Sequence, residues 1–400
     1  MRSVLKYLLP VLPVCLLVCG CNREDEQFEN VGGLQEFIPV YNAYISDWIA
    51  EQLEDAELGI AKHEEGLAQA EDDASRKYHN ELLAEFVDKK ERMEFRQNIG
   101  DYFAYKKIED LPDGLVWENG LDQPDLGDPD AKKGGVFRYF FRTFDYPSTL
   151  REAGLGAGST GFRAEIYDDI QVGLVQIHPS TGKVMPGVAC EWAEDPNGRT
   201  VYYRIDPDAR YADGEEIIME DFFRAVWIRV SDYITEPYGK QYFREQIAQL
   251  AIYDERTIAF SLPAPRPLLP YYACGGGLDP ASKKFFSEYG PDYEERYNWR
   301  VAPSTGAYYV KDEDVKKGVS ITLTRAENWW GDKKKFYRNR YNPEKIQYTL
   351  VRDRSKAWEL FRAGEIDYFR ITEPYFWYEK SEMPPVFDGY IEKWTWYNQY

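Results

Sequence analysis

The sequence predicts an α/β protein that carries an α-helical extension on its N-terminal side. Apolar residues between Phe37 and Tyr105 recur at three- and four-residue spacing, which is typical of amphipathic helices. From Gly135 onward, runs typical of β-strands alternate with turns and a few helices. The stretch TVYYRIDPDARYADGEEIIMEDFFRAV passes from an alternating strand, through a Gly-containing turn, into a helical stripe.

Length and charge limit the classes of function. With 400 residues the chain can form two or more domains with sizeable cores. The net charge of −20 and the lack of a basic stripe argue against nucleic acid as a partner. The 32 Tyr, 21 Phe and 11 Trp residues suit the walls of a ligand cleft, but they suit large β-sheet cores equally well.

The first twenty residues predict export. Arg2 and Lys6 precede an apolar run, residues 7–18, which has the length of a signal peptide and is too short to span a bilayer comfortably. The run ends in LVCGCN, which resembles a bacterial lipobox and implies lipid attachment at Cys21. We therefore expect a signal peptide over 1–20, a tether over 21–36, and a lipid-anchored protein of the cell envelope, either periplasmic or on the outer face of the cytoplasmic membrane. An ordinary signal peptide cleaved elsewhere is the alternative.

Two cysteines remain in the mature chain, Cys190 and Cys274. They could pair in an oxidising compartment, although the sequence does not show whether they are close. Their surroundings lack the CxxC or His spacing of a metal site, and we expect neither a metal nor a cofactor.

The extension, residues 37–110, predicts two or more helices. Ile45, Trp48, Ile49 and Leu53 belong to one apolar stripe, and a second stripe follows after Lys77. The weakly apolar residues 61–77 predict a bend, so a projecting stalk and a docked hairpin both fit. Residues 111–134 are rich in Pro, Gly and Asp and predict a linker.

Several motifs that could carry chemistry have a better structural interpretation. GAGSTG, residues 156–161, lacks the preceding strand and the following acid of a dinucleotide-binding loop, so we expect an exposed loop that could still contact a ligand. The three histidines are His63, His79 and His178, and neither HExxH nor GxSxG occurs. His178 opens HPSTGK, which predicts a turn between two strands.

Five carboxylates gather at the junction YADGEEIIMED, namely Asp213, Glu215, Glu216, Glu220 and Asp221. Asp213-Gly214 predicts a turn, and Glu220 and Asp221 fall in the first turn of the following helix, where the helix dipole favours negative charge. We interpret the group as a strand–turn–helix junction. A metal site and an acid/base pair are the alternatives.

Six segments in order resemble the family 5 extracellular solute-binding proteins of ABC transporters. They are HPSTGKVMPGVACEW, YRIDPDARYADGEEIIMEDF, IYDERTIAFSLPAP, VAPSTGAYYV, ITLTRAENWWG and YTLVRDRSKAWELFRAGEIDYF. The resemblance covers about Gly135 to Tyr368. Ile218 and Met219 stand where the family usually has a hydroxyl-bearing helix cap and a small residue, and Ala307 stands where Pro is common. The helical extension lies outside the family pattern.

The resemblance implies a type II periplasmic-binding-protein-like α/β fold with two lobes. Lobe I would occupy 135–373, built from the strand near 135–144 and the segment 303–369, with an inserted subdomain at about 165–297. Lobe II would begin at 374–400 and is expected to be largely missing, so that this chain alone should bind ligand weakly or not at all. Tyr308 and Trp329 are expected in the core of lobe I. The loop after the first strand supplies the candidate ligand-binding residues, Asp145, Ser159, Thr160 and Arg163.

The resemblance also implies a binding protein rather than an enzyme. It would capture a small solute, by default a peptide, between its lobes and deliver it to an ABC transporter permease, acting as a monomer. Two other functions remain open at this point. An exported carboxylate-dependent glycan hydrolase would suit the acids and Trp residues, and a lipid-anchored adaptor could act through the helical extension.

Overall fold

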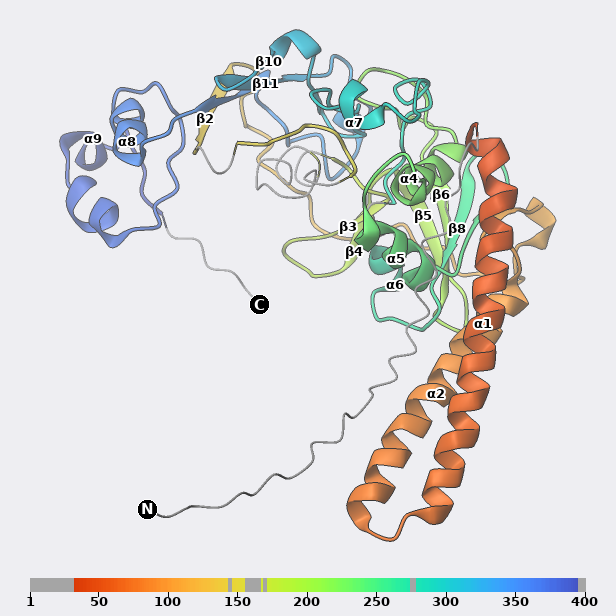
Figure 1. Cartoon of the computed structure of the whole chain (residues 1–400). Coiled ribbons are helices and arrows are strands. Elements are labelled where there is room, and N and C mark those ends of the chain that lie inside the picture. Colours follow the sequence, from red (N-terminus) through yellow and green to blue (C-terminus); the bar gives the residue numbers. More distant parts are fainter. Residues whose placement is uncertain (1–31, 143–145, 155–166, 168–170, 274–277, 395–400) are drawn as a thin grey trace, which may run out of the picture.

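The computed structural model describes residues 32–142, 146–154, 167, 171–273 and 278–394. Two five-stranded sheets form its framework. A third, smaller sheet has two strands, which pair with each other and not with the larger sheets. A helical hairpin projects from one side of the molecule, and a small helical unit lies at the opposite side (Figure 1). The family-like segments therefore fold into a mixed α/β body, as the sequence predicts.

The hairpin consists of α1 (Leu34–Gln69) and α2 (Asp73–Ile99). The turn between them falls inside the predicted bend, and Asp72 caps α2 by accepting a hydrogen bond from the Ser75 amide. Helix α1 begins three residues before the predicted start and contains Pro39, because Leu34 and its neighbours Phe37 and Ile38 are buried against the body. The far end of the hairpin extends beyond the sheets (Figure 1). It therefore combines the docked hairpin and the stalk that the sequence left open.

The first sheet has the strand order β1-β7-β8-β6-β5. Its strands are β1 (Phe103–Tyr105), β5 (Ala189–Glu194), β6 (Thr200–Ile205), β7 (Gln249–Ile252) and β8 (Thr257–Ser261). Strand β1 comes from the end of the helical extension and pairs in parallel with β7. The sequence analysis did not predict this strand, which makes the extension part of the sheet.

The second sheet joins segments that lie far apart in the sequence. β2 (Val136–Phe141) pairs in parallel with β12 (Lys345–Leu350), which pairs with β11 (Ser320–Arg325). β10 (Val315–Lys316) and β9 (Tyr308–Tyr309) complete the sheet through β11. The parallel pair places the strand at 136–141 beside a strand of the segment 303–369.

The small sheet consists of β3 (Val175–Ile177) and β4 (Val184–Pro186), which flank the predicted turn at His178. The body also contains α4 (Glu220–Val230), α5 (Pro237–Gln246), α6 (Leu269–Ala273) and α7 (Tyr293–Arg296). Short 3-10 helices occupy Ile108–Asp110, Asp312–Asp314 and Trp330–Lys333.

After β12 the chain forms a separate small core. It contains α8 (Arg354–Arg362), a π-helix (Phe376–Lys380) and α9 (Pro384–Phe387). Phe140, Trp358, Phe369 and Phe376 are buried together here, apart from the main core. Across the described ranges, no helix has the length and apolar character needed to cross a membrane.

Candidate ligand-binding site

The residues predicted to contact ligand, Asp145, Ser159, Thr160 and Arg163, lie outside the described residues, as does the predicted lipidation site Cys21. The structure does describe residues 146–154, which lie between Asp145 and Ser159 in the candidate loop, and Tyr167, which follows the loop.

Backbone and side-chain hydrogen bonds fix the segment 146–154 to the body. The Leu150 amide donates to the Asn298 carbonyl at 2.7 Å, and the Thr149 hydroxyl donates to the same oxygen at 2.8 Å. The Tyr293 hydroxyl accepts from the Ala153 amide at 3.1 Å. Both contacts come from the segment around α7, so this short helix positions the start of the candidate loop.

A buried ion pair extends the same frame. Arg229 of α4 lies 3.0 Å from Glu152, and both side chains are largely buried. Burial alone would lower the pKa of Arg229, but attraction to Glu152 and Glu236 outweighs it, and the pKa rises above its ordinary value. Glu236 also accepts a hydrogen bond from the Gly154 amide at 3.1 Å. Gly154, within the candidate loop, is thus held to the start of α5.

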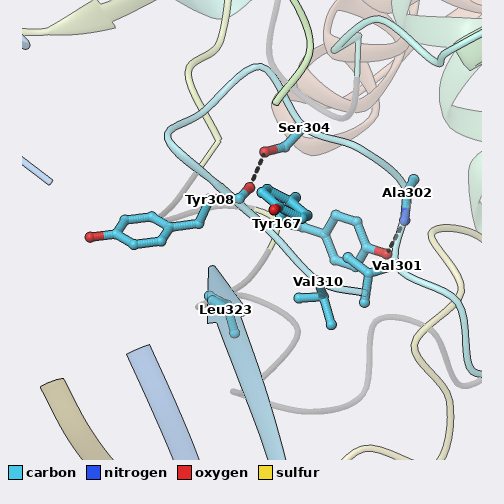
Figure 2. A pocket seen from close by; sticks show the side chains of 8 residues that line it. Tyr167, Val301, Ala302, Ser304, Tyr308, Val310 and Leu323 are labelled. Atoms are coloured by element: carbon cyan, nitrogen blue, oxygen red, sulfur yellow. Dashed lines mark hydrogen bonds between the residues drawn. The ribbon is translucent and has the colours of Figure 1, made fainter. Parts of the chain in front are cut away.

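Tyr167 secures the other side of the loop. Its hydroxyl donates to the Leu150 carbonyl at 2.7 Å and accepts from the Ala302 amide at 3.2 Å. It lines a small cavity together with Leu323 and residues of the segment 301–310 (Figure 2). The cavity measures about 10 Å³, which is the room that one water molecule needs. This cavity is therefore too small to be a peptide site, and Tyr167 acts as a brace.

The segment VAPSTGAYYV, which lines the same cavity as Tyr167, is held by buried hydrogen bonds. The Thr305 side chain is fully buried and donates to the Val172 carbonyl. The Thr305 carbonyl accepts from the indole N–H of Trp329 at 3.1 Å and of Trp330 at 2.8 Å. Tyr308 and Trp329 are buried, which confirms their predicted place in the core.

The junction carboxylates are bound by other groups of the chain. Asp221 is buried, accepts from the Tyr211 hydroxyl at 2.9 Å and the Ile218 amide at 3.2 Å, and lies 2.7 Å from Arg224. Burial raises the pKa of Tyr211 well above its ordinary value, and the neighbouring Asp221 carboxylate adds to the effect. Met219, at the N-cap position, makes no side-chain capping bond, and Asp221 instead links the first turn of α4 to the Ile218 amide that precedes the helix.

Two other acids of the junction form ion pairs with different partners. Glu215 forms an ion pair with Lys284 at 2.5 Å, whereas Glu216 pairs with Arg210 at 3.1 Å. Gly214 has a φ of 88°, as its place in the predicted turn requires. These contacts confirm the strand–turn–helix interpretation. Within the described part of the chain, no group of three or more His, Cys, Asp or Glu side chains could hold a metal ion.

The histidines and Cys190 take structural positions. His178 follows β3 and is buried, with Nε2 3.1 Å from the Pro124 carbonyl, as a turn residue packed under the linker. His63 and His79 contact each other within the hairpin, which sequence spacing did not predict. Cys190 is a free thiol, and Cys274 lies outside the described residues, so the structure does not test their pairing.

Lys334 joins the two larger sheets. Its ammonium group lies 2.7 Å from Asp206, which follows β6, and 2.9 Å from Asp208. Burial would lower the pKa of Lys334, but hydrogen bonds to Asp206 and Asp208 raise it. The sequence analysis did not identify this contact, since its partners are more than 120 residues apart.

Together these features define a mixed α/β body in which hydrogen bonds hold residues 146–154 and Tyr167 to the neighbouring segments. The sequence matches the family described as "Bacterial extracellular solute-binding proteins, family 5 Middle" over residues 183–397, which is more than half of the chain. The chain belongs to this family. The match confirms the resemblance found in the sequence and the predicted type II binding-protein fold.

Curated relatives share low identity over part of their length. The chain is 26% identical over 284 residues to the "Probable peptide-binding protein YejA" of Agrobacterium fabrum, covering 70% of this chain and 44% of the relative. It is 21% identical over 198 residues to the "Dipeptide-binding protein DppE" of Bacillus subtilis, covering 46% of this chain and 34% of the relative. The chain thus spans less than half the length of these relatives.

Solved structures give weaker likenesses. The oligopeptide-binding protein AppA from Bacillus subtilis, in complex with a nonapeptide, has a TM-score of 0.47 and 17% identity, covering 59% of this chain and 44% of that chain. OppA of Haemophilus influenzae, in complex with RPPGFSPFR, has a TM-score of 0.45 and 20% identity, covering 59% of this chain and 45% of that chain.

Proposed function

We propose that the chain belongs to the extracytoplasmic binding component of an ABC importer for peptides. The observation that carries the proposal is the family match over residues 183–397. Relatives described as peptide-binding and dipeptide-binding proteins give peptides as the ligand class. In this role the protein has no catalytic activity and needs no cofactor. It acts as a monomer that captures a peptide and delivers it to a membrane permease.

The candidate loop contributes polar contacts to the peptide. Asp145 would pair with a peptide ammonium group, Arg163 would pair with a carboxylate, and Ser159 and Thr160 would bind backbone groups. The bonds to residues 146–154 and Tyr167 support this role, because a binding loop on a rigid frame loses less conformational freedom when ligand binds. A fixed frame also keeps the two sides of the loop at a constant separation.

The ligand is tested by mass spectrometry of the material that co-purifies with the protein expressed in its full natural length. Peptides should be recovered with the wild type and depleted in Arg163→Ala. Arg76→Ala, in the hairpin, is the matched control and should retain them, because Arg76 is an exposed arginine far from the loop in sequence. Recovery of sugars or metal chelates instead of peptides would contradict the proposed ligand class.

Lipid attachment at Cys21 is the second part of the proposal. Cells expressing the wild type should place the protein in the detergent phase of a Triton X-114 partition, and Cys21→Ser should move it to the aqueous phase. Cys19→Ser is the control and should leave the partition unchanged, since only the lipidated cysteine becomes the new N-terminus. Equal partition of wild type and Cys21→Ser would exclude the anchor without affecting the ligand test.

A further inference from the structure

Two of the three histidines of the chain meet in the hairpin between α1 and α2. Their Nδ1 atoms lie 3.0 Å apart, which is a hydrogen-bonding distance. His63 is 4% exposed and His79 is half-buried, so the pair lies in the helix–helix interface and not on the surface. The interface lies in the part of the hairpin that extends beyond the sheets (Figure 1).

Close packing holds the two rings in this position. Gly66 leaves the space for His79, because a Cβ atom at residue 66 would lie 2.2 Å from the imidazole. Gly59 makes the same kind of room for Phe86, whose ring stacks on His63 with centroids 5.6 Å apart. The two glycines therefore let the helices pack closely around both rings.

The number of protons on the pair decides whether the contact is attractive. With neutral rings, or with one positive ring, one Nδ1–H donates and the other Nδ1 accepts. With both rings protonated, two N–H groups face each other and no acceptor remains. The exposed side chains of Lys62 and Glu64, of opposite charge, flank His63 in α1, whereas Arg76 lies one turn before His79 in α2 and adds a positive charge beside the pair. The nearby Lys77 of α2 is paired with Glu81 at 3.7 Å.

Burial, the positive charge on His79 and the charge on Lys62 together lower the pKa of His63 below its ordinary value. A group whose pKa is lower in the folded state stabilises that state above its ordinary pKa, and the stabilisation is lost as the pH falls. The direction agrees with the geometry of the pair.

We propose that the distal hairpin, residues 59–86, is a pH-responsive element that is closed around a His63–His79 pair holding at most one proton and opens when both rings are protonated. The expected size follows from an ordinary histidine pKa of about 6.5. If His63 takes up its proton only in the open form, the opening equilibrium rises about tenfold between pH 7.5 and pH 5.5. The body of the protein remains folded over this range.

The test is hydrogen–deuterium exchange of the whole chain at pH 7.5 and pH 5.5, in the presence of EDTA, with rates corrected for intrinsic exchange. Protection factors of peptides from residues 59–86 should fall about tenfold at the lower pH. Peptides from residues 34–49, which are docked on the body, are the internal reference and should not change. His63→Phe should abolish the pH dependence, because phenylalanine keeps the stacking on Phe86 but cannot be protonated.

His79→Gln is the second variant and should also abolish the pH dependence. Tyr78→Phe is the matched control, because it changes an adjacent aromatic residue and leaves both imidazoles in place, so it should behave as the wild type. Equal protection of the wild type at the two pH values, or an unchanged pH dependence in His63→Phe, would overturn the proposal. A pH dependence that appears only when EDTA is replaced by a divalent metal would also overturn it, and would assign the pair to metal binding.

Discussion

Replacement of Asp221 by alanine should destabilise the body strongly. Asp221 is 1% exposed, and it binds the Tyr211 hydroxyl, the Ile218 amide and the Arg224 guanidinium group. Its second oxygen also accepts from the Lys283 amide at 3.2 Å. The side chain therefore connects the turn before α4, the helix itself and the segment that follows α6.

The expected loss of stability follows from Arg224, the buried charged group that loses its partner in Asp221→Ala. Arg224 is 6% exposed, and it would become a buried charge without its partner. Loss of one partner of a buried ion pair costs about 3–5 kcal/mol. With an unfolding entropy of about 2.1 cal/mol/K per residue, a 400-residue chain that unfolds as one unit would lose about 5 °C in Tm for about 4 kcal/mol.

Urea unfolding followed by tryptophan fluorescence, together with a thermal melt by circular dichroism, measures this loss. Asp213→Ala is the matched control, because Asp213 is an exposed aspartate of the same turn and should change stability by less than about 1 kcal/mol. Asp221→Ala combined with Arg224→Met removes the unpaired charge and should recover part of the loss. A loss below about 1 kcal/mol for Asp221→Ala, or no recovery in the double variant, would refute the reasoning.

Three further changes test other contacts. Thr305→Val removes the hydroxyl that donates to the Val172 carbonyl and should lower the free energy of unfolding by about 1–3 kcal/mol in urea titrations, while an unchanged midpoint would contradict the role of Thr305. Lys334→Met leaves the buried Asp206 carboxylate without its cation, so the melting temperature of the body should fall, and an unchanged melting temperature would contradict the role of this ion pair. Gly66→Ala places a methyl group 2.2 Å from the facing imidazole and should increase hydrogen exchange in residues 59–86 at neutral pH. Wild-type protection of these residues in the variant would contradict this expectation.

The sequence predicted the elements whose signals are local. The stripe of Phe222, Phe223, Val226 and Trp227 marked α4, and all four side chains are buried, although the other faces of the helix are buried as well. The turn at Asp213-Gly214 and the strand before it also follow from local chemistry. The order of the six family-like segments predicted the fold class, because each segment predicted where one strand or turn lies in the chain.

Contacts between distant segments could not be predicted in this way. The alternation in β6 predicts one buried face, with Val201, Tyr203 and Ile205, yet Tyr202 on the opposite face is buried as well. Residues of the predicted linker cover that face, and Trp117 packs there with Arg204 stacked 3.7 Å from its ring centroid. Strand β1 is three residues long, too short for a periodic signal, and its pairing with β7 spans more than 140 residues.

The way in which the hairpin is attached explains why its far end can respond to pH independently. At the base, Trp48 lies between two guanidinium groups, with Arg96 at 5.0 Å and Arg244 at 5.5 Å from the ring centroid. Arg96 donates to the Arg244 carbonyl at 2.7 Å, and burial lowers its pKa to about 10. Its Nε and Nη2 atoms are buried without a hydrogen-bond partner, so Arg96 is not the main source of stability at the base.

Stability at the base must then come from the apolar face of α1, with Phe37, Tyr41, Ile45 and Ile49 all buried in the main core. Asn42 adds two hydrogen bonds to Phe103, at 2.8 Å and 3.0 Å, which fix β1 at the edge of its sheet. None of these groups is a histidine or an acid, so none changes its charge between pH 5.5 and pH 7.5. The base of the hairpin should therefore stay docked when the His63–His79 contact opens.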